Sequence, residues 1–379
     1  MTQVPRDELT RTGSLRDRTA STALAYYVSA HGYGHGVRSC DIVRALNDLR
    51  PDIRVNLVSN LPASLFRNRL PSDSNCFRRG SFDLGMVQLD SIRVDVGATL
   101  KGIESLYARR RELVDQEAAF MAEAGISLVV VDIPALPLEA AASRGIPGIA
   151  VGNFGWDWIY SSFIPQDRRW ERIVSEIRDG YAQADLLLRL PFAEEMRAFR
   201  RVEDLPVVAS PGLERRTEIA RLTGANENLP WVLISFTTLE WDQTALDRVG
   251  RCAGFEFFTV LPLEWHRPNF HAIDRDRVPF KDVIASMDVV VSKPGFGILS
   301  DCLVNSKPLI YADRKDFPEY AVLERAIRKY LKHEHIPAEK LYAGDLCTAL
   351  GRALDLPSPP LSYPVGGAAV AARRLLDFL

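Results

Sequence analysis

Short runs of β-branched and aliphatic residues alternate with longer amphipathic stretches along most of the chain. This alternation is typical of parallel strands joined by crossover helices, and it predicts an α/β fold throughout. In the first half, strands are predicted at residues 23–29, 53–59, 86–89, 127–132, 148–152 and 186–189. Helices are predicted at residues 37–49, 107–124 and 170–184. These elements suffice for one doubly wound domain.

The pattern pauses at Ala209-Ser210-Pro211-Gly212 and then begins a second series of similar size. Its strands are predicted at residues 231–236, 255–260, 288–292 and 308–311, and its helices at residues 242–251, 281–287, 297–305 and 319–331. We therefore predict two Rossmann-like domains, residues 22–210 and 211–365. Residues 366–379 have a helical pattern after a proline-rich stretch, and we expect them to return to the first domain. Residues 1–21 are polar and predicted to be disordered.

Charge and composition narrow the class of partner. The 379 residues include 47 basic and 49 acidic ones, and this balance argues against nucleic acid or anionic lipid as partners and favours a small molecule. The strongest apolar run, residues 126–138, is broken by Asp132 and two prolines and falls short of the roughly 20 residues of a membrane span. Five cysteines without a CxxC pair predict reduced thiols, and residues 1–21 lack the apolar centre of a signal peptide. We expect a cytoplasmic protein with no integral membrane span.

The turn His31-Gly32-Tyr33-Gly34-His35 follows the first predicted strand. Open parallel sheets place their ligands at this end of a strand. The glycines allow close approach to a ligand, and the next helix directs its free N–H groups into the same space. An imidazole there is suited to accept a hydroxyl proton at neutral pH. The alternative is that His31 and His35 cap the turn or bond to the sheet edge.

A second turn, Ser292-Lys293-Pro294-Gly295-Phe296-Gly297, also lies between a predicted strand and a helix. Its successive N–H groups could cradle a phosphate, although a glycine pair at such a place is often a turn and nothing more. No Gly-Lys-Ser/Thr follows, so it is not a Walker loop, and the dinucleotide glycine spacing is absent from the first turn.

A third candidate is the aromatic segment 153–160, which contains Asn153, Trp156 and Asp157. Aromatic faces with interleaved polar groups suit sugar rings, and the alternative is an aromatic plug in the core. Asp132 is either another crevice carboxylate or a helix N-cap before Pro134. The cluster His333-Glu334-His335 has no further ligands at suitable spacing, so we expect a solvated loop and no metal site.

Taken together, the two turns, the equal halves and the returning helix resemble the GT-B glycosyltransferases, particularly the family 28-like group that includes the bacterial peptidoglycan N-acetylglucosaminyltransferase. A narrower resemblance, over about residues 25–370, is to the N-terminal, glycosyltransferase-like half of the plant L-arabinokinases. It rests on these matching strings: Ala25-Tyr26-Tyr27-Val28, the first turn with Arg38, Asn153-Phe154 with Trp156-Asp157 and Ile159-Tyr160, Arg189-Leu190-Pro191, and Gly295-Phe296-Gly297 with Leu299-Ser300. No kinase half follows, so phosphorylation of arabinose is not implied.

The resemblance implies a GT-B fold whose domains face a cleft, with the donor nucleotide sugar on the second domain and the acceptor on the first. In this family Gly295 and Gly297 would contact the diphosphate, Asp301 the ribose and Glu319 the donor sugar. His35, with His31, would supply the base. The donor side comprises Lys293, Gly295, Phe296, Gly297, Asp301, Glu319, Thr237 and Thr238, and the acceptor side comprises Gly32, Gly34, Arg38, Asp132, Asn153, Trp156 and Asp157.

Three departures from the family pattern bear on activity. Ile298 stands where threonine is common, Asp301 where glutamate is common, and Thr237-Thr238-Leu239-Glu240 where the loop is usually glycine-rich. Glu240 near a diphosphate would lower affinity unless it points away. The leading hypothesis is a metal-independent glycosyltransferase with no cofactor, a nucleotide sugar (UDP favoured) as co-substrate and an unknown acceptor. The alternatives are an inactive nucleotide-sugar-binding or sensing protein and a nucleotide-sugar epimerase.

Overall fold

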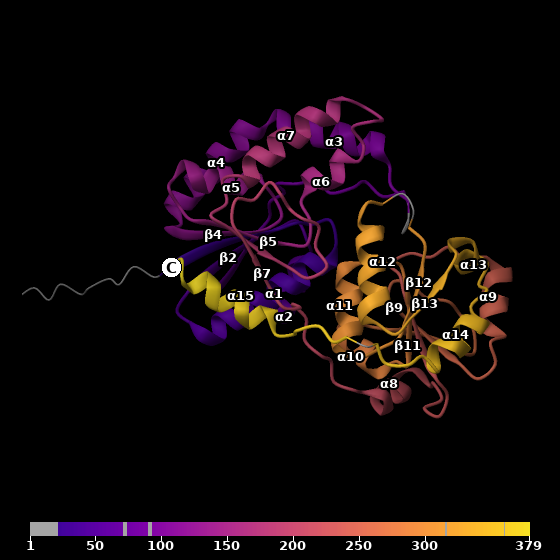
Figure 1. Cartoon of the computed structure of the whole chain (residues 1–379). Coiled ribbons are helices and arrows are strands. Elements are labelled where there is room, and N and C mark those ends of the chain that lie inside the picture. Colours follow the sequence, from indigo (N-terminus) through magenta and orange to yellow (C-terminus); the bar gives the residue numbers. More distant parts are fainter. Residues whose placement is uncertain (1–21, 71–73, 90–92, 315–316, 360) are drawn as a thin grey trace, which may run out of the picture.

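The computed structural model describes residues 22–70, 74–89, 93–314, 317–359 and 361–379. The predicted disordered extension at residues 1–21 lies outside them. Two α/β domains stand side by side, each built on one parallel sheet, of seven and six strands (Figure 1). The fold is therefore the predicted pair of doubly wound domains.

The first domain begins with β1 (Ala23–Val28), a strand buried along its whole length. Its further strands are β2 (Arg54–Val58), β3 (Asn75–Arg78), β4 (Ile126–Asp132), β5 (Gly148–Gly152), β6 (Leu186–Arg189) and β7 (Val202–Asp204). Its helices are α1 (Tyr33–Leu49), α2 (Ala63–Arg69), α3 (Val96–Ala108), α4 (Arg110–Glu123), α5 (Leu136–Ser143), α6 (Trp156–Ser161) and α7 (Arg169–Tyr181).

The second domain repeats this plan. Its strands are β8 (Trp231–Ser235), β9 (Glu256–Val260), β10 (Phe270–Ile273), β11 (Val289–Ser292), β12 (Leu309–Ala312) and β13 (His333–Ile336). Its helices are α8 (Arg216–Thr223), α9 (Gln243–Gly250), α10 (Phe280–Ser286), α11 (Phe296–Val304), α12 (Glu319–Tyr330), α13 (Ala338–Tyr342) and α14 (Cys347–Leu354).

Strand order fixes where a ligand can sit in each domain. The orders are β3-β2-β1-β4-β5-β6-β7 and β10-β9-β8-β11-β12-β13, so the order reverses between β1 and β4 and again between β8 and β11. Crevices of doubly wound sheets open at this reversal, beyond the carboxyl ends of the strands. The two glycine turns follow β1 and β11, so both lie at such a crevice.

Several predicted elements need correction. Residues 86–89 form no strand, because the N–H groups of Met86 and Val87 are taken by the side chains of His31 and Thr99. The predicted helix 107–124 lies in two helices, α3 and α4, which meet at Arg109. The His333-Glu334-His335 cluster is part of the edge strand β13 and not a loop. Strands β3, β7 and β10 were not predicted, because they are short and carry polar residues near the sheet edges.

The last helix, α15 (Gly367–Leu376), packs against α1 of the first domain (Figure 1). Ala371, Ala372 and Leu375 belong to the apolar core on that face of the first sheet. Arg374 adds a two-pronged ion pair with Glu203 of β7. The chain therefore crosses the domain boundary twice.

The prediction of reduced thiols is wrong for one pair of cysteines. Cys252 and Cys347 form a disulfide that joins the end of α9 to the start of α14, with Cα atoms 5.3 Å apart. They are 95 positions apart in sequence, so no local spacing could have indicated the pairing. Cys40, Cys76 and Cys302 are free thiols.

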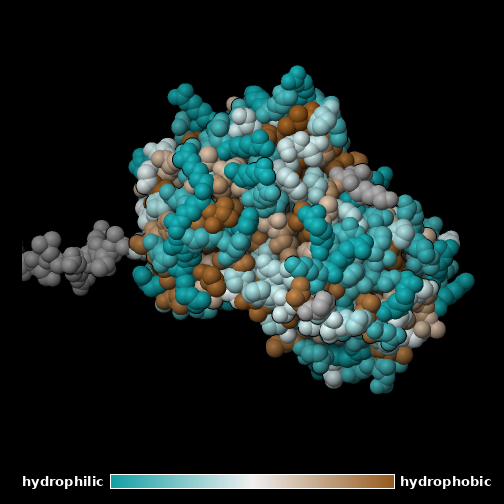
Figure 2. Space-filling model, in the orientation of Figure 1, coloured by the Kyte–Doolittle hydropathy of each residue, from teal (hydrophilic) through white to brown (hydrophobic). Residues whose placement is uncertain are grey.

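The surface in Figure 2 is largely hydrophilic, with apolar residues in small scattered areas. Among the helices of the described residues, none combines the length and the apolar character that crossing a membrane requires.

Candidate functional site

The two glycine turns lead directly into helices. After β1 the chain passes through His31 and Gly32, and α1 begins at Tyr33 with Gly32 as an extended N-cap that has no side-chain cap. After β11 it passes through Lys293, and α11 begins at Phe296 with Gly295 as an extended N-cap, again without a side-chain cap. In α1 the N–H of His35 donates to the Gly32 carbonyl over 3.3 Å, so the N–H groups before it, and those at the start of α11, are the ones left for a ligand or water.

The two turns meet across the domain boundary. A methyl group placed on Gly297 would lie 3.9 Å from Cα of Gly34. Beside them the rings of Phe154, from the first domain, and Phe296, from the second, stack with centroids 5.9 Å apart. The starts of α1 and α11 therefore lie against each other at the domain boundary.

A buried histidine–aspartate pair lies on the first-domain side of this contact. Nδ1 of His35 lies 2.7 Å from Oδ1 of Asp132, and Asp132 is fully buried at the end of β4. Because a carboxylate can only accept, the contact with Asp132 places the proton on Nδ1 and leaves the lone pair on Nε2. Nη2 of Arg38 lies 3.0 Å from the same Nδ1, and it donates to Oδ1 of Asp132 instead. Asp132 is therefore not the N-cap of the next helix, α5, whose N-cap is Ala135.

Arg38, one turn further along α1, holds the other side of this carboxylate. Its Nε donates to Oδ2 of Asp132 over 2.6 Å and its Nη2 to Oδ1 over 2.5 Å. Its Nη1 donates over 2.5 Å to the side-chain oxygen of Asn153, whose amide donates to the carbonyl of Pro191. Burial alone would raise the pKa of Asp132, but Arg38 and His35 outweigh it and lower this pKa to about 2.

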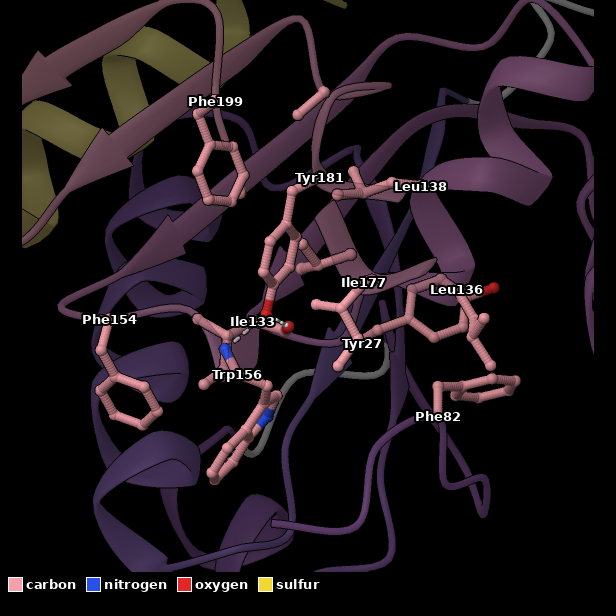
Figure 3. Packing of buried hydrophobic residues seen from close by; sticks show 14 of the residues in the cluster. Tyr27, Phe82, Ile133, Leu136, Leu138, Phe154, Trp156, Ile177, Tyr181 and Phe199 are labelled. Atoms are coloured by element: carbon pink, nitrogen blue, oxygen red, sulfur yellow. Dashed lines mark hydrogen bonds between the residues drawn. The ribbon is translucent and has the colours of Figure 1, made fainter. Parts of the chain in front are cut away.

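The residue after Asp132 has a strained backbone. Ile133 adopts a φ of 67°, a left-handed conformation that is rare for a β-branched residue. The Tyr181 hydroxyl donates to the Ile133 carbonyl over 2.9 Å and accepts from the N–H of Trp156 over 3.0 Å (Figure 3). Tyr181 therefore ties the segment that carries Asp132 to the aromatic segment.

His31 has surroundings different from those of His35. Its Nδ1 accepts from the N–H of Met86 over 3.2 Å, so its proton lies on Nε2. Burial lowers the pKa of His31 to about 3, and the electrostatic effects of His35, Arg314 and Lys293 act in the same direction. His31 is thus neutral at physiological pH and has Nε2–H to donate.

The second domain adds charged groups at the same part of the domain boundary. Glu319, the first residue of α12, is buried, and burial raises its pKa to about 7 although Arg314, Arg38 and Lys293 act in the opposite direction. Arg314 is buried as well and its guanidinium lies 3.9 Å from the centroid of the Phe317 ring. The charge of Glu319 raises the pKa of Arg38, and the charge of Arg38 lowers the pKa of Glu319. The charged groups of the two domains therefore form one cluster.

Asp301, predicted to contact the ribose, lies on α11 and faces the first domain. Burial raises its pKa to about 7, Asp41 of α1 raises it further, and Arg69 of α2 lowers it. It therefore lies against the α1–α2 side of the domain boundary.

The structure places the remaining predicted residues in different surroundings, some in the core and some at the surface. Trp156 is buried, with its Nε1 bonded to Asp83 over 2.9 Å, so it is part of the aromatic core and its ring is not an open platform. Asp157 pairs with Arg178 over 3.1 Å and faces a cavity next to the site. Thr237 and Thr238 are exposed after β8, the neighbour of β11, so their loop adjoins the second turn.

Arg314, Asp83 and Tyr181 are site residues that the sequence analysis missed. Arg314 follows β12 at the same edge as the second turn, and this position after a buried strand was the one usable signal. Asp83 and Tyr181 had no such signal, because they reach the site through the Trp156 side chain and backbone. Within the described residues, no group of three or more His, Cys, Asp or Glu side chains could hold a metal ion.

Comparison with sequences of known proteins finds a plant relative. The chain is 30% identical over 359 residues to an L-arabinokinase of Arabidopsis thaliana. The match spans 93% of this chain and 34% of that protein, so the chain covers about a third of the length of the relative. No family model matches the chain.

Solved structures of similar shape are glycosyltransferases. The calicheamicin glycosyltransferase CalG4 has a TM-score of 0.57 at 13% identity over 94% of both chains. SnogD from Streptomyces nogalater has a TM-score of 0.55 at 14% identity, over 95% of this chain and 100% of its own. UGT2 of Phytolacca americana, solved with UDP-2fluoro-glucose and pterostilbene, has a TM-score of 0.55 at 13% identity over 94% of both chains. The chain thus has the GT-B glycosyltransferase fold, and over most of its length it is similar to part of a plant L-arabinokinase.

Proposed function

We propose that the chain is a metal-independent glycosyltransferase that moves a sugar from a nucleotide-sugar donor to a hydroxyl of an acceptor. The observation that carries this proposal is the position of the His35–Asp132 pair and Gly34 directly opposite the start of α11. A proton acceptor and an anion-binding helix start then face the same reacting centre.

His35 is the proposed general base. Its Nδ1–H is fixed on Asp132, which leaves the Nε2 lone pair to take the proton of an acceptor hydroxyl as the oxygen attacks the anomeric carbon. The buried carboxylate holds the tautomer and stabilises the imidazolium that forms. His31 uses Nδ1 to accept from Met86, so we assign it a hydrogen-bond donor role and not that of a base.

The second domain would stabilise the departing nucleoside diphosphate. The free N–H groups at Phe296 and Gly297, at the positive end of α11, suit a diphosphate, and Lys293 and Arg314 supply positive charge nearby. Buried Glu319, with its raised pKa, can donate a hydrogen bond when protonated or accept one from a sugar hydroxyl when ionised. We propose UDP as the carrier, since a glycosyltransferase of this shape was solved with a UDP-sugar.

The test uses the purified chain and a panel of UDP-sugars, with release of UDP as the readout. We expect thermal stabilisation by UDP and turnover of at least one donor. His35→Ala should lower that turnover about 10²–10⁴-fold and keep UDP binding. His266→Ala is the matched control, because His266 is a largely exposed histidine of the second domain. Equal turnover in the His35 variant would refute the assigned base.

A second candidate is nucleotide-sugar binding without turnover. It is favoured by Arg38, which occupies both oxygens of Asp132 and so offsets the negative charge that would support an imidazolium. UDP-sugar binding without release of UDP from any donor of the panel would select this candidate.

A further inference from the structure

A large cavity lies between the domains beside the site just described. Its volume is about 840 Å³, within the ordinary range for small-molecule sites. One wall comes from α6, α7 and the segment after β6, and the other from α12, which stands at the domain boundary (Figure 1). Its lining residues are Asp157, Trp158, Arg178, Ala193, Glu194, Glu195, Arg197, Ala198, Pro318, Ala321, Val322 and Arg325.

Both walls are joined directly to residues of the site. On the first domain, the N–H of Glu194 donates over 3.0 Å to the carbonyl of Asn153, whose side chain holds Arg38. On the second domain, Pro318 immediately precedes Glu319. The lining of the cavity is therefore connected to the charged cluster around His35 through one backbone hydrogen bond on the first domain and one peptide bond on the second.

The charges of the lining select the kind of molecule. Six of the twelve lining residues are charged, three acidic and three basic, so the cavity favours neither an anion nor a cation. All three acids already have a partner, since Asp157 pairs with Arg178, Glu195 pairs with Arg197, and Oε2 of Glu194 accepts from the N–H of Met196 over 2.7 Å. An apolar molecule would remove water from these groups without replacing its hydrogen bonds, at a cost in affinity. A neutral molecule with many hydroxyl groups would replace them.

An aromatic side chain completes the lining. Trp158 is half-buried and faces the cavity, whereas its neighbours Trp156 and Tyr160 are fully packed in the core. A half-buried indole offers an apolar face next to polar groups, and this combination suits the C–H face and the hydroxyl rim of a sugar ring. The aromatic segment thus has a residue positioned for a sugar, although it is not the predicted Trp156.

We propose that this cavity binds the acceptor and that the acceptor is a neutral carbohydrate, stacked on Trp158 with hydroxyls on Glu194 and Arg325. The acceptor role rests on the proposed glycosyltransferase function. The carbohydrate class rests on the cavity alone. A carbohydrate acceptor would differ from pterostilbene, with which UGT2 of Phytolacca americana, a protein of the same fold, was solved.

Binding is tested with L-arabinose and lactose as carbohydrate probes and pterostilbene as an aromatic one, by saturation-transfer NMR and Trp fluorescence on the full chain. Trp158→Ala and Arg325→Ala should each weaken binding of the sugar probes at least about tenfold. Arg328→Ala is the matched control, because Arg328 lies on the same helix, pairs with Glu324 and does not line the cavity. Arg325 is exposed, so its variant tests the cavity even if Trp158→Ala unfolds.

Sugar binding that depends on Trp158 and Arg325 but not on Arg328 supports the proposal. Sugar binding indifferent to both cavity variants overturns the location. Binding of pterostilbene alone, or of no probe, overturns the carbohydrate class. UDP binding is measured in parallel: UDP binding without sugar binding refutes the cavity assignment and leaves the proposed function standing. Sugar binding in the cavity without UDP binding refutes the proposed function and leaves the assignment of a carbohydrate to the cavity standing.

Discussion

Nδ1 of His35 donates to Oδ1 of Asp132 over 2.7 Å, although the two residues are 97 positions apart in the chain. Adjacent parallel strands, β1 and β4, bring them together, since His35 follows one strand and Asp132 ends the other. The pair therefore exists because of the strand order, and it lies where that order reverses.

Replacing Asp132 should lower the stability of the folded chain. In Asp132→Asn the guanidinium of Arg38 stays buried without its carboxylate, and breaking a buried pair in this way typically costs about 3–5 kcal/mol. Asp204→Asn, which breaks the surface pair with Arg189, should cost below about 1 kcal/mol. Urea unfolding of both variants measures the difference. Equal losses would show that the buried pair contributes no more than the exposed one.

Tyr181 is expected to position the Asp132 segment. Tyr181→Phe leaves the Ile133 carbonyl and the Trp156 N–H without a partner in the core, so we expect the free energy of unfolding to fall by about 1–3 kcal/mol. Tyr160→Phe removes one hydrogen bond, to the Gly85 carbonyl, and should cost less. Thermal unfolding compares the two. If Tyr181→Phe is as stable as the natural chain, its hydroxyl does not hold the strained residue.

Stability should depend on pH through Glu319. Burial raises its pKa from 4.5 to about 7 in the folded chain, so the folded state binds this proton more tightly than the unfolded state. Stability therefore falls as pH rises from about 4.5 to about 7 and then levels off.

Glu319→Gln should make this slope shallower and stabilise the chain above pH 7 by about 1–3 kcal/mol. Asp301, with a pKa also raised by burial to about 7, keeps part of the slope. Glu324→Gln controls for loss of a carboxylate from the same helix. The measurement is chemical unfolding at several pH values, and an unchanged slope in Glu319→Gln would contradict the assignment.

The disulfide should contribute to the stability of the second domain. Cys252 and Cys347 close a loop of 95 residues, and a natural disulfide typically contributes about 2–4 kcal/mol. Reduction, or Cys252→Ser, should lower the melting temperature. Cys76→Ser removes an exposed free thiol and should not. A reductant without effect on melting would mean that the bond adds nothing to stability.

The fold could be predicted because its central strands are apolar and separated by amphipathic helices. Strands β1, β4 and β8 carry this pattern clearly. The edge strands β7 and β13 do not, because an edge strand pairs on one side alone and its residues here are mostly polar. Their existence depends on the neighbouring strand and not on their own residues.

The candidate site could be predicted only in part from the sequence. The glycine turns are local features, so His35, Gly34 and Gly297 could be found from the sequence. The partners of these residues depend on tertiary structure: Arg38 with Asp132, and Tyr181 with Ile133. Trp156 and Trp158 are two positions apart in an aromatic segment, and only packing shows which one is buried.

The position of α15 has a consequence for how the chain folds during synthesis. Its residues Ala371, Ala372 and Leu375 cover α1, yet the ribosome makes them more than 300 positions later. Until then Cys40 and Val43 of the first domain lack part of their apolar cover, while the second domain can already fold. The domain that emerges first is therefore the one completed last, and a fragment that ends at the domain boundary should aggregate more readily than the whole chain.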